Sequence, residues 1–541
     1  MKMKRIAGLL VAGILVGCCA HESARAVDAV LRAEGVTVNG KPVTDAEWRE
    51  EPDGIAVRYR LPSGKRVISG ETTFWQLPED AMCWYQVGVN SYESPYSWNE
   101  VKNMPKGKVL SLPITFRLRD GTYRLITEAN LVDYTDLAVT YEGEGRFVAC
   151  YHAEKGPFEQ TGAVTTPWRV MIVAKDLNQL ATSDLVRRLC PPPTNANSIA
   201  IAKPGRAIWQ WLPANSPKYA EQKDWYDKTA ALGFEYYLID DGWRDWRDGA
   251  DDQWTCLTKA ISYGRSVGVK TAIWVHSKEM AKASTRRPYL EKVVRAGAVG
   301  IKIDFMPPCD SKWCKWYEET LAETAELGLF VDFHGAVKPT GRERTWPHEL
   351  AREAIRGHEY HISRYHRILP PEHDTILPFC RLVQGHGDYT PVVFQPDQLV
   401  HFTWPRQLAQ GVVMACPFLC FGDYPANYLA SPMRDIVKAL PATYDETIVL
   451  PGSEIGDLVA MARRKGSVWF VAVENASQEK ELKIPLSFLK SGKWNLLGFR
   501  DAPNGRLDDC VKETVDVDAS SVLSVRINSC GGYIAMLTPK Q

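Results

Sequence analysis

Four apolar stretches in the middle of the chain each end in a side chain that can exchange a proton or bind a hydroxyl group. These endings are Asp240 with Asp241, His276, Asp304 and His334. One such residue alone is typical of a structural hydrogen bond, whereas four in consecutive stretches favour an active site. If the stretches are parallel strands of a barrel, their carboxyl ends meet at the face where barrel enzymes carry their chemistry. The sequence therefore predicts a site rich in carboxylates and histidines.

Two further carboxylates, Glu353 and Glu359, follow in residues 346–360. Pro347 suits a helix start and Gly357 the position just past a helix end, so a helix is predicted between them. Six residues apart, the two glutamates would point about 120° apart on a helix and lie about 20 Å apart on a strand. Only a chain reversal at Gly357 would bring them together.

Clustered carboxylates and histidines suit two chemistries, which the residues alone leave open. One is glycoside hydrolysis by a pair of carboxyl groups, and the other is hydrolysis assisted by a metal ion that carboxylates and histidines hold. The chain has no HExxH, P-loop or GxGxxG motif, which disfavours metalloproteases and nucleotide-binding enzymes. Lys+Arg and Asp+Glu both number 65, and without a basic excess we expect no nucleic-acid partner.

The elements that must position these residues alternate between apolar strands and longer helical patterns. The strand-like segments are residues 207–212, 236–240, 270–276, 300–305 and 329–334. This alternation over residues 189–440 predicts a (β/α)8 TIM barrel. Short alternating runs on either side predict an N-terminal β-sandwich over residues 27–188 and a C-terminal β-sandwich over residues 441–541. The Pro-rich residues 190–194 form the link to the barrel.

Residues 1–26 are predicted to be a signal peptide. Lys2, Lys4 and Arg5 precede an apolar run over residues 6–17 that is too short to cross a membrane as a mature helix. Residues 15–18 resemble a lipobox, which would place a lipid anchor at Cys18, while residues 24–26 resemble a cleavage site of the A-x-A type. We expect an exported protein, either periplasmic or a cell-surface lipoprotein of the outer membrane, without a membrane-spanning helix.

An ordered set of motifs resembles glycoside hydrolase family 97. No single motif is decisive, but together they run in order through most of the chain: residues 127–134 (TEANLVDY), 240–243 (DDGW), 300–306 (GIKIDFM), 334–336 (HGA), 352–360 (REAIRGHEY), 387–391 (GDYTP) and 444–447 (YDET).

The resemblance implies the same three-domain architecture and hydrolysis of α-glucosides or α-galactosides with a calcium ion in the active site. Inverting members carry a glutamate as general base just after the histidine that ends the fifth strand, where this chain has Gly335. Retaining members carry a nucleophilic aspartate at the end of the fourth strand, where this chain has Asp304. The chain thus resembles the retaining branch, whose activity is α-galactosidase.

The same resemblance implies individual roles. Asp304 would be the nucleophile and Glu359 the acid/base, with their carboxyl groups about 5–5.5 Å apart. Calcium would be held by Glu128, Glu353 and Glu359, because it takes hard oxygen ligands. Substrate hydroxyl groups would contact Asp240, Asp241, His276 and His334.

Lys302 lies two residues before Asp304 and on the same side of its strand. It would bind substrate or lower the pKa of Asp304, unless it only forms a structural ion pair. The expected enzyme is an exo-acting, retaining α-galactosidase that acts as a monomer on an oligosaccharide or glycoside. An α-glucosidase of the same family and an inactive carbohydrate-binding lipoprotein are the alternatives.

Overall fold

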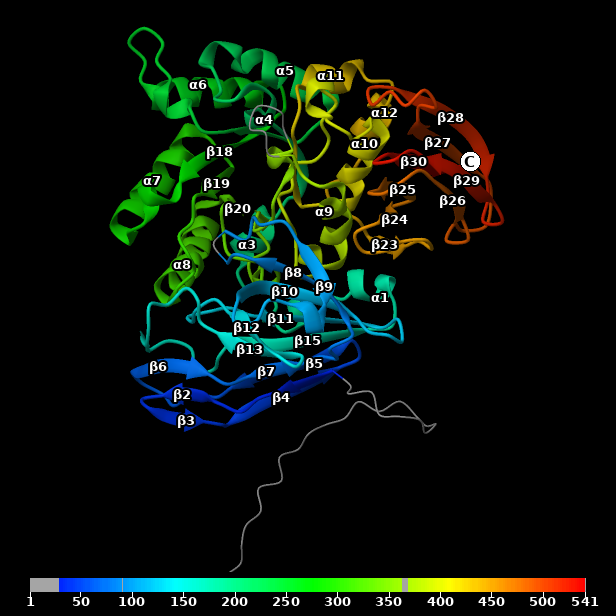
Figure 1. The fold of residues 1–541 in the computed structure, drawn as a ribbon. Helices are drawn as coiled ribbons and strands as arrows, with labels where there is room; N and C mark the ends of the chain where they lie inside the picture. Colours follow the sequence, from blue (N-terminus) through cyan, green and yellow to red (C-terminus); the bar gives the residue numbers. More distant parts are fainter. Residues whose placement is uncertain (1–28, 90, 362–367, 541) are drawn as a thin grey trace, which may run out of the picture.

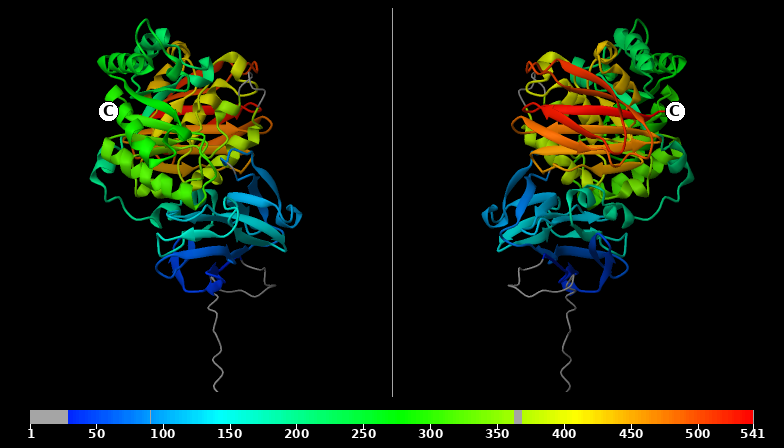
Figure 2. Two further views of the ribbon diagram at one scale, coloured as in Figure 1. Left: turned by 90° about the vertical axis from the view of Figure 1, so that its left-hand side faces the viewer. Right: turned by 90° about the vertical axis from the view of Figure 1, so that its right-hand side faces the viewer.

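The computed structural model describes residues 29–89, 91–361 and 368–540, so the predicted signal peptide with Cys18 lies outside the described residues. Along the chain come an N-terminal group of β-sheets, a central α/β barrel and a C-terminal group of β-sheets (Figure 1). The two β-sheet regions contact the barrel from different sides (Figure 2). Within the described residues no helix is long and apolar enough to cross a membrane.

The N-terminal region contains one sheet of 11 strands and one of four strands. Their pairing is antiparallel, as in β10 (Val109–Arg117) with β11 (Tyr123–Ala129), which in turn pairs with β15 (Trp168–Ala174). Successive residues of β15 face opposite sides of the sheet. Val170 and Ile172 pack in one core with Ile68 of the smaller sheet, while Met171 packs in a second core with Ile114. Both faces of this strand are therefore buried.

The barrel sheet is parallel throughout and nearly closed, as the sequence pattern predicts. In order of the chain its strands are β16 (Gly205–Trp209), β17 (Tyr236–Ile239), β18 (Lys270–His276), β19 (Gly300–Asp304), β20 (Phe330–Phe333), β21 (Glu349–Arg352) and β22 (Phe418–Phe421). β22 pairs with β16, so the last strand meets the first. The main helices between the strands are α5 (Gln222–Leu232), α6 (Gln253–Ser266), α7 (Ala283–Ala296), α8 (Ser311–Leu327) and α10 (Trp404–Val413).

An eighth strand is not confirmed among the described residues. Between β21 and β22 runs an irregular segment, whose Asp388 N–H donates to Arg352 O at 3.3 Å. Three residues on, the carbonyl of Pro391 accepts from Gly422 N–H at 3.1 Å. The segment thus fills the remaining gap, but Thr390 and Val392 have φ of 56° and 68°, outside the range of a strand.

The helix predicted between Pro347 and Gly357 is wrong. Residues 349–352 form β21, and Glu359 lies in a short 3-10 turn, η6 (His358–Tyr360). All four residues of β21 are buried, and a strand covered on both faces lacks the alternation that distinguishes strands in sequence. The chain reversal after this strand does occur, as the geometry of Glu353 and Glu359 requires.

The C-terminal region consists of a six-stranded antiparallel sheet and a two-stranded one, β26 (Lys480–Pro485) with β29 (Val522–Ile527). Helix α10 of the barrel packs against β25 (Val468–Asn475) and β30 (Gly532–Pro539). The N-terminal region is joined to the barrel by hydrogen bonds, including Asn130 N–H to Thr340 O at 2.8 Å. The barrel is therefore held on two sides.

Candidate active site

A cavity of about 390 Å³ opens at the carboxyl ends of the barrel strands. Seven of the predicted site residues line it, namely Asp240, Asp241, Lys302, Asp304, His334, Glu353 and Glu359. The lining also includes Gly335, which stands where inverting members carry their base, and residues that were not predicted for the site, namely Glu93, Trp209, Trp211, Trp274, Phe305 and Tyr360. The strand endings thus converge on one cavity, with aromatic rings in its wall.

Asp304 ends β19 and points both carboxylate oxygens at hydrogen-bond donors. Its Oδ2 accepts from Trp274 Nε1 at 2.8 Å, and its Oδ1 accepts from the N–H of Phe305 at 2.6 Å. The Nδ1 of His334 lies 3.3 Å from the same Oδ1. Burial alone would raise the pKa of Asp304, but His334, Lys302 and Trp274 outweigh it and hold the pKa below its ordinary value. Asp304 is therefore an ionised carboxylate facing the cavity.

His334 follows β20 and links Asp304 to Glu353. Its Nδ1 lies 3.0 Å from Glu353 Oε2 as well as 3.3 Å from Asp304. Burial would lower the pKa of His334, yet the carboxylates of Glu353 and Asp304 raise it well above its usual value. The imidazole thus lies between two carboxylates, and its protonated form, which they favour, would stabilise their negative charges.

Lys302 is almost fully buried beneath the cavity. Its Nζ lies 3.3 Å from Asp240 Oδ2 and 4.4 Å from the centre of the Trp209 ring. Asp240 Oδ2 also accepts from Trp209 Nε1 at 2.6 Å. Burial would lower the pKa of Lys302, but the charge of Asp240, followed by other aspartates including Asp304, raises it well above its ordinary value. Lys302 therefore forms a buried ion pair with Asp240 and also helps to keep Asp304 ionised.

The other two predicted contacts to substrate differ from each other. Asp241 lines the cavity, although its Oδ1 is engaged by Arg244 at 2.8 Å. His276 does not line the cavity: its Nδ1 accepts from Lys278 N–H at 3.2 Å, and its ring packs 5.1 Å from that of Phe305. Burial, aided by nearby Lys278, lowers its pKa. Phe305, whose ring packs against His276, lines the cavity instead.

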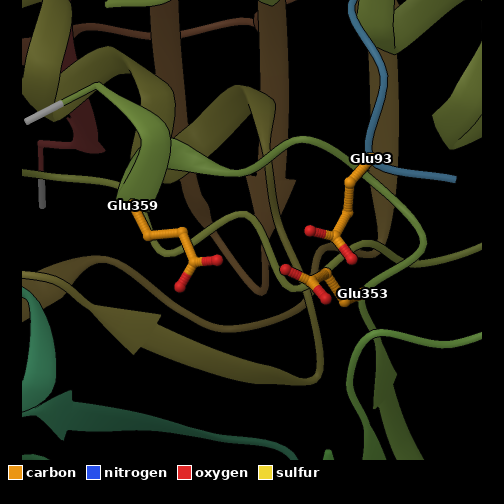
Figure 3. A group of neighbouring side chains, drawn as sticks. All are labelled: Glu93, Glu353 and Glu359. Atoms are coloured by element: carbon orange, nitrogen blue, oxygen red, sulfur yellow. The ribbon is translucent and has the colours of Figure 1, made fainter. Parts of the chain in front are cut away.

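A cluster of three glutamates lies at one side of the cavity (Figure 3). Ligand atoms of Glu93, Glu353 and Glu359 lie within 4.8 Å of one another. Glu353 is buried, and its Oε1 has no hydrogen-bond partner among the described residues. Burial raises the pKa of Glu353 well above its usual range. The negative charge of Glu93 and, to a smaller extent, that of Glu359 add to this rise. Three converging carboxylates, one of them with an oxygen that has no partner among the described residues, are a donor set that suits a hard divalent cation.

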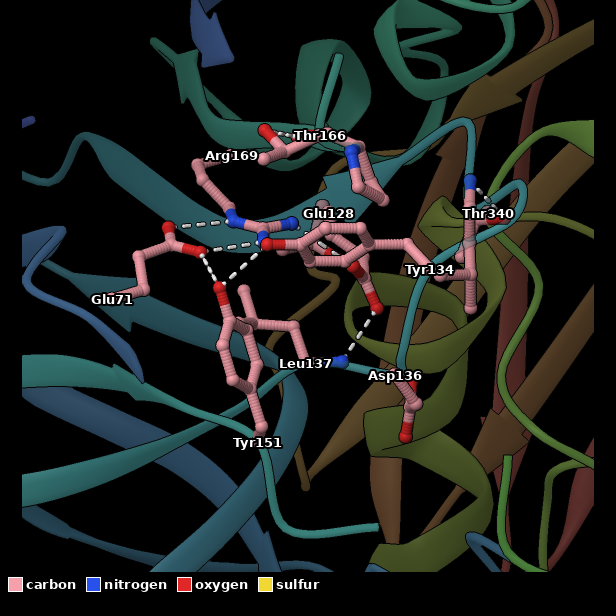
Figure 4. A network of polar contacts seen from close by, with 12 residues as sticks. Glu71, Glu128, Tyr134, Asp136, Leu137, Tyr151, Thr166, Arg169 and Thr340 are labelled. Carbon is pink, nitrogen blue, oxygen red and sulfur yellow. Dashed lines mark hydrogen bonds and ion pairs between the residues drawn. The ribbon is translucent and has the colours of Figure 1, made fainter. Parts of the chain in front are cut away.

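Glu128 does not belong to this cluster, so its predicted place beside Glu353 and Glu359 is wrong. Its Oε1 accepts from Lys338 Nζ at 2.6 Å, and its Oε2 accepts from Arg169 at 3.2 Å. The N–H of Leu137 also donates to it, at 3.0 Å (Figure 4). Two cations and a backbone donor satisfy this carboxylate inside the contact between the N-terminal region and the barrel.

Glu93 supplies the N-terminal carboxylate instead, from the loop between β8 (Met82–Val87) and β9 (Ser97–Glu100). Its Oε2 accepts from the hydroxyl of Tyr360 at 2.7 Å, and its carbonyl accepts from Arg356 Nε at 2.6 Å. No strand ending or motif marks Glu93 in the sequence, since it lies in an irregular loop far from the barrel along the chain.

Gly335 lies directly beside Asp304. Its N–H donates to Glu353 Oε2 at 2.6 Å, and its φ is 54°. A Cβ atom at this position would lie 3.3 Å from Asp304 Oδ1 and 3.3 Å from Phe305 N. No acidic side chain is available here to activate water, and little space is left for one.

A parallel barrel with carboxyl groups clustered in its cavity suits glycoside hydrolysis. Three models of glycoside hydrolase family 97 match the chain: the N-terminal model over residues 28–192, the glycoside hydrolase model over residues 202–355, and the C-terminal model, described as serving oligomerisation, over residues 443–538. The chain belongs to glycoside hydrolase family 97. The description of the C-terminal model does not support the expectation of a monomer.

Two curated relatives align with nearly the whole chain. A "Probable retaining alpha-galactosidase" of Streptomyces bingchenggensis is 31% identical over 503 residues, covering 91% of this chain and 77% of the relative. A "Retaining alpha-galactosidase" of Bacteroides thetaiotaomicron is 26% identical over 570 residues, covering 92% of this chain and 84% of the relative.

Solved structures share the fold at lower identity. A family 97 enzyme from Pseudoalteromonas sp. strain K8, solved in complex with acarbose, superposes with a TM-score of 0.82 at 21% identity, covering 95% of this chain and 88% of that one. A β-arabinopyranosidase superposes with a TM-score of 0.79 at 23% identity, covering 91% and 84%.

Proposed function

We propose that this enzyme is an exo-acting, retaining α-galactosidase that works through a covalent glycosyl-enzyme intermediate on Asp304. The observation that carries the proposal is the ionised Asp304 facing the cavity beside Gly335, which offers no carboxylate to activate water. With no base at that position, the carboxylate itself must attack the sugar. The names of the two curated relatives support a galactoside as the substrate.

The reaction has two steps. Asp304 attacks the anomeric carbon while Glu359, protonated at the start, donates its proton to the departing oxygen. The raised pKa of Glu359, caused first by burial, suits the acid, and the lowered pKa of Asp304 suits the nucleophile. Glu359 then takes a proton from water, which attacks the same carbon and releases the sugar with retained configuration. Lys302 and Asp240 at the base of the cavity bind the hydroxyl groups of the terminal sugar.

We assign the glutamate cluster to a calcium ion. Glu93, Glu353 and Glu359 would hold it, because their oxygens converge and Oε1 of Glu353 has no other partner among the described residues. When bound, the ion would supply positive charge to the cavity. Glu353 also accepts a hydrogen bond from Gly335 and lies against His334, so it orients the residues around Asp304.

Three proposals concern the whole chain. Residues 1–26 direct export, to the periplasm or, through Cys18, to the outer membrane or cell surface as a lipoprotein.

The segment around Asp388 and Pro391 takes the place of the missing strand of a (β/α)8 barrel. Copies of the chain associate through residues 443–538, in keeping with the description of the C-terminal family model.

Anomer-resolved NMR of the first product tests the proposed function. On a panel of nitrophenyl α-galactoside, α-glucoside and β-L-arabinopyranoside, we expect α-galactose to appear before mutarotation. Release of β-galactose would overturn the retaining mechanism, and faster release of glucose would instead support an α-glucosidase. A chelator added to half of the samples tests the calcium assignment.

The Asp304→Asn variant tests the nucleophile on the same panel. We expect its activity to fall at least about 10³-fold, because the group that forms the covalent bond is gone. Parental activity in this variant would refute the assignment. A crystal structure with a trapped sugar should place the Asp304 and Glu359 carboxyl groups about 5–5.5 Å apart, whereas roughly 8 Å or more is inverting geometry.

A further inference from the structure

Lys338 is a fully buried cation at the contact between the barrel and the N-terminal region. It lies four residues after His334, and its Nζ donates to Glu128 at 2.6 Å and to the carbonyl of Leu137 at 3.0 Å. The same Nζ donates to Asp136, and it lies 3.2 Å from the hydroxyl of Tyr92. All these partners belong to the N-terminal region, so one ammonium group gathers several of its segments onto the barrel.

Tyr92 connects this cluster to the cavity, because it directly precedes Glu93. The ring is buried, and its hydroxyl donates to Asp136, which Lys338 also binds. Ser91 and Tyr92 have φ of 60° and 62°, a left-handed conformation that costs free energy for residues other than glycine. Such a conformation persists where contacts enforce it, and the buried hydroxyl of Tyr92 provides that contact.

On its other side Glu93 meets the barrel through Arg356 and Tyr360. The loop is thus held at Tyr92 by Lys338 of the barrel together with Asp136, and at Glu93 by two further barrel contacts. The remaining charges of the cluster do not need Tyr92: Arg169 binds Glu71 at 2.8 and 2.7 Å and Glu128 at 3.2 Å. The hydroxyl of Tyr92 can therefore be removed while every buried charge keeps a partner.

We propose that Lys338, Asp136 and Tyr92 form an anchor that positions Glu93 in the active-site cavity. The anchor also gives Glu128, in a motif of the N-terminal region, a role outside the cavity lining: it balances the charge of Lys338. The proposal rests on the proposed function in one respect, namely that Glu93 serves the catalytic site as a metal ligand. Lys338 touches neither the cavity nor the reacting atoms, so it is a positioning residue.

Tyr92→Phe is the decisive variant, because Lys338→Met would leave Glu128 and Asp136 buried without their cation and could prevent folding. We expect backbone amides of residues 91–96 to exchange hydrogen about tenfold faster in Tyr92→Phe than in the parent, with the remaining N-terminal strands unchanged. Tyr85→Phe is the matched control: it removes a buried tyrosine hydroxyl in the neighbouring β8, where Tyr85 accepts from Asn99 at 3.0 Å, without touching Lys338. Equal exchange over residues 91–96 in the two variants would overturn the anchor.

Calcium titration by calorimetry gives a second measure on the same full-length proteins. We expect Tyr92→Phe to bind calcium about tenfold more weakly than the parent, as when the supporting contacts of a metal ligand are removed. The loss should vanish in the Glu93→Gln background if the anchor acts through Glu93. An undiminished loss there would overturn the proposal. If the parent binds no calcium, that result counts against the calcium assignment alone, and hydrogen exchange, which needs neither metal nor substrate, still decides the anchor.

Discussion

Asp304 and Glu359 are both carboxyl groups in one cavity, and their surroundings move their pKa values in opposite directions. Burial raises both, but Asp304 receives two hydrogen bonds, from Trp274 and the Phe305 N–H, and lies beside His334 and Lys302, which lower its pKa. The pKa of Glu359 stays raised by burial, and the charges of Asp304 and Glu93 add to this effect. Pairs of titratable groups whose pKa values are moved apart by their surroundings carry the acid and base roles in many enzymes.

Replacing Glu359 with glutamine should separate its role as acid from its other effects. The acid must be protonated, so parental kcat/KM should fall as pH rises through the raised pKa of Glu359. On the acidic side activity should persist to unusually low pH, because Asp304 stays ionised. In Glu359→Gln we expect kcat/KM no longer to fall at alkaline pH. The rate on an unactivated α-galactoside should drop about 10²–10⁴-fold.

The measurement is kcat/KM against pH for an alkyl galactoside and a dinitrophenyl galactoside. The dinitrophenyl group departs without a proton, so its first step should suffer far less. Glu372→Gln, in α9 (Pro371–Ile376) outside the cavity lining, is the control and should match the parent. An equal loss on both substrates, with the alkaline fall still present, would argue against Glu359 as the acid.

At the scale of elements, strands β19 and β20 are each followed by a residue with a left-handed φ, and these two residues lie next to each other. Phe305 follows β19 with a φ of 59°, held because its carbonyl accepts from Ser277 Oγ at 2.6 Å and its N–H donates to Asp304. Gly335 is the second residue after β20, directly after His334, and its φ is 54°. This backbone aims the ring of Phe305, 61% exposed, at the rim of the cavity while Asp304 stays inside.

Gly335→Ala should therefore damage both stability and catalysis. The left-handed φ costs a residue with a Cβ about 1–2 kcal/mol, and the new methyl group would press on Asp304 and Phe305. Gly328→Ala is the matched control, because Gly328 ends α8 with a φ of 77° and nothing within 4 Å of its Cβ position. We expect both variants to melt at lower temperature, and only Gly335→Ala to lose kcat. Comparable kcat values in the two variants would show that close packing beside Asp304 is unimportant.

The sequence predicts elements where the hydrophobic pattern is regular and fails where position depends on tertiary contacts. The ends of the strands carrying Asp240, Asp304 and His334 follow from the pattern of apolar runs, and these residues do meet in one cavity. Strand β21 is buried on both faces, so no alternation distinguishes it from a helix. Glu93 reaches the cavity only because two domains pack together, and no local pattern encodes that contact.

At the scale of the whole molecule, buried ion pairs join regions that are distant in sequence. Arg406, in α10 of the barrel, lies 3.2 Å from Asp374 and 3.9 Å from Glu474 of the C-terminal β25. It also donates to the carbonyls of Asn475 and Pro371, and all three charged side chains are buried. The barrel and the C-terminal sheet thus share one guanidinium group, as the barrel and the N-terminal region share Lys338.

Arg406→Met should loosen this junction. Asp374 and Glu474 would remain buried without a cation, which costs about 3–5 kcal/mol when one partner of a buried pair is removed. We expect a clear drop in the thermal midpoint measured by calorimetry. Arg434→Met is the control, since Arg434 is 53% exposed and lies 3.9 Å from Asp435, so its loss should change stability by no more than about 0.5 kcal/mol.

The pH dependence of the drop identifies its cause. Burial, with the charge of Asp374 adding to it, raises the pKa of Glu474 well above 4.5, and Arg406 opposes the rise. A carboxyl group whose pKa is higher in the folded than in the unfolded state loses its stabilising contribution as pH rises through the folded pKa. Without Arg406 that pKa rises further, so the variant should lose more stability relative to the parent at pH 8 than at pH 5. A deficit independent of pH would instead mean that Arg406 stabilises the junction by packing over Phe402, whose ring centre lies 3.9 Å from its guanidinium.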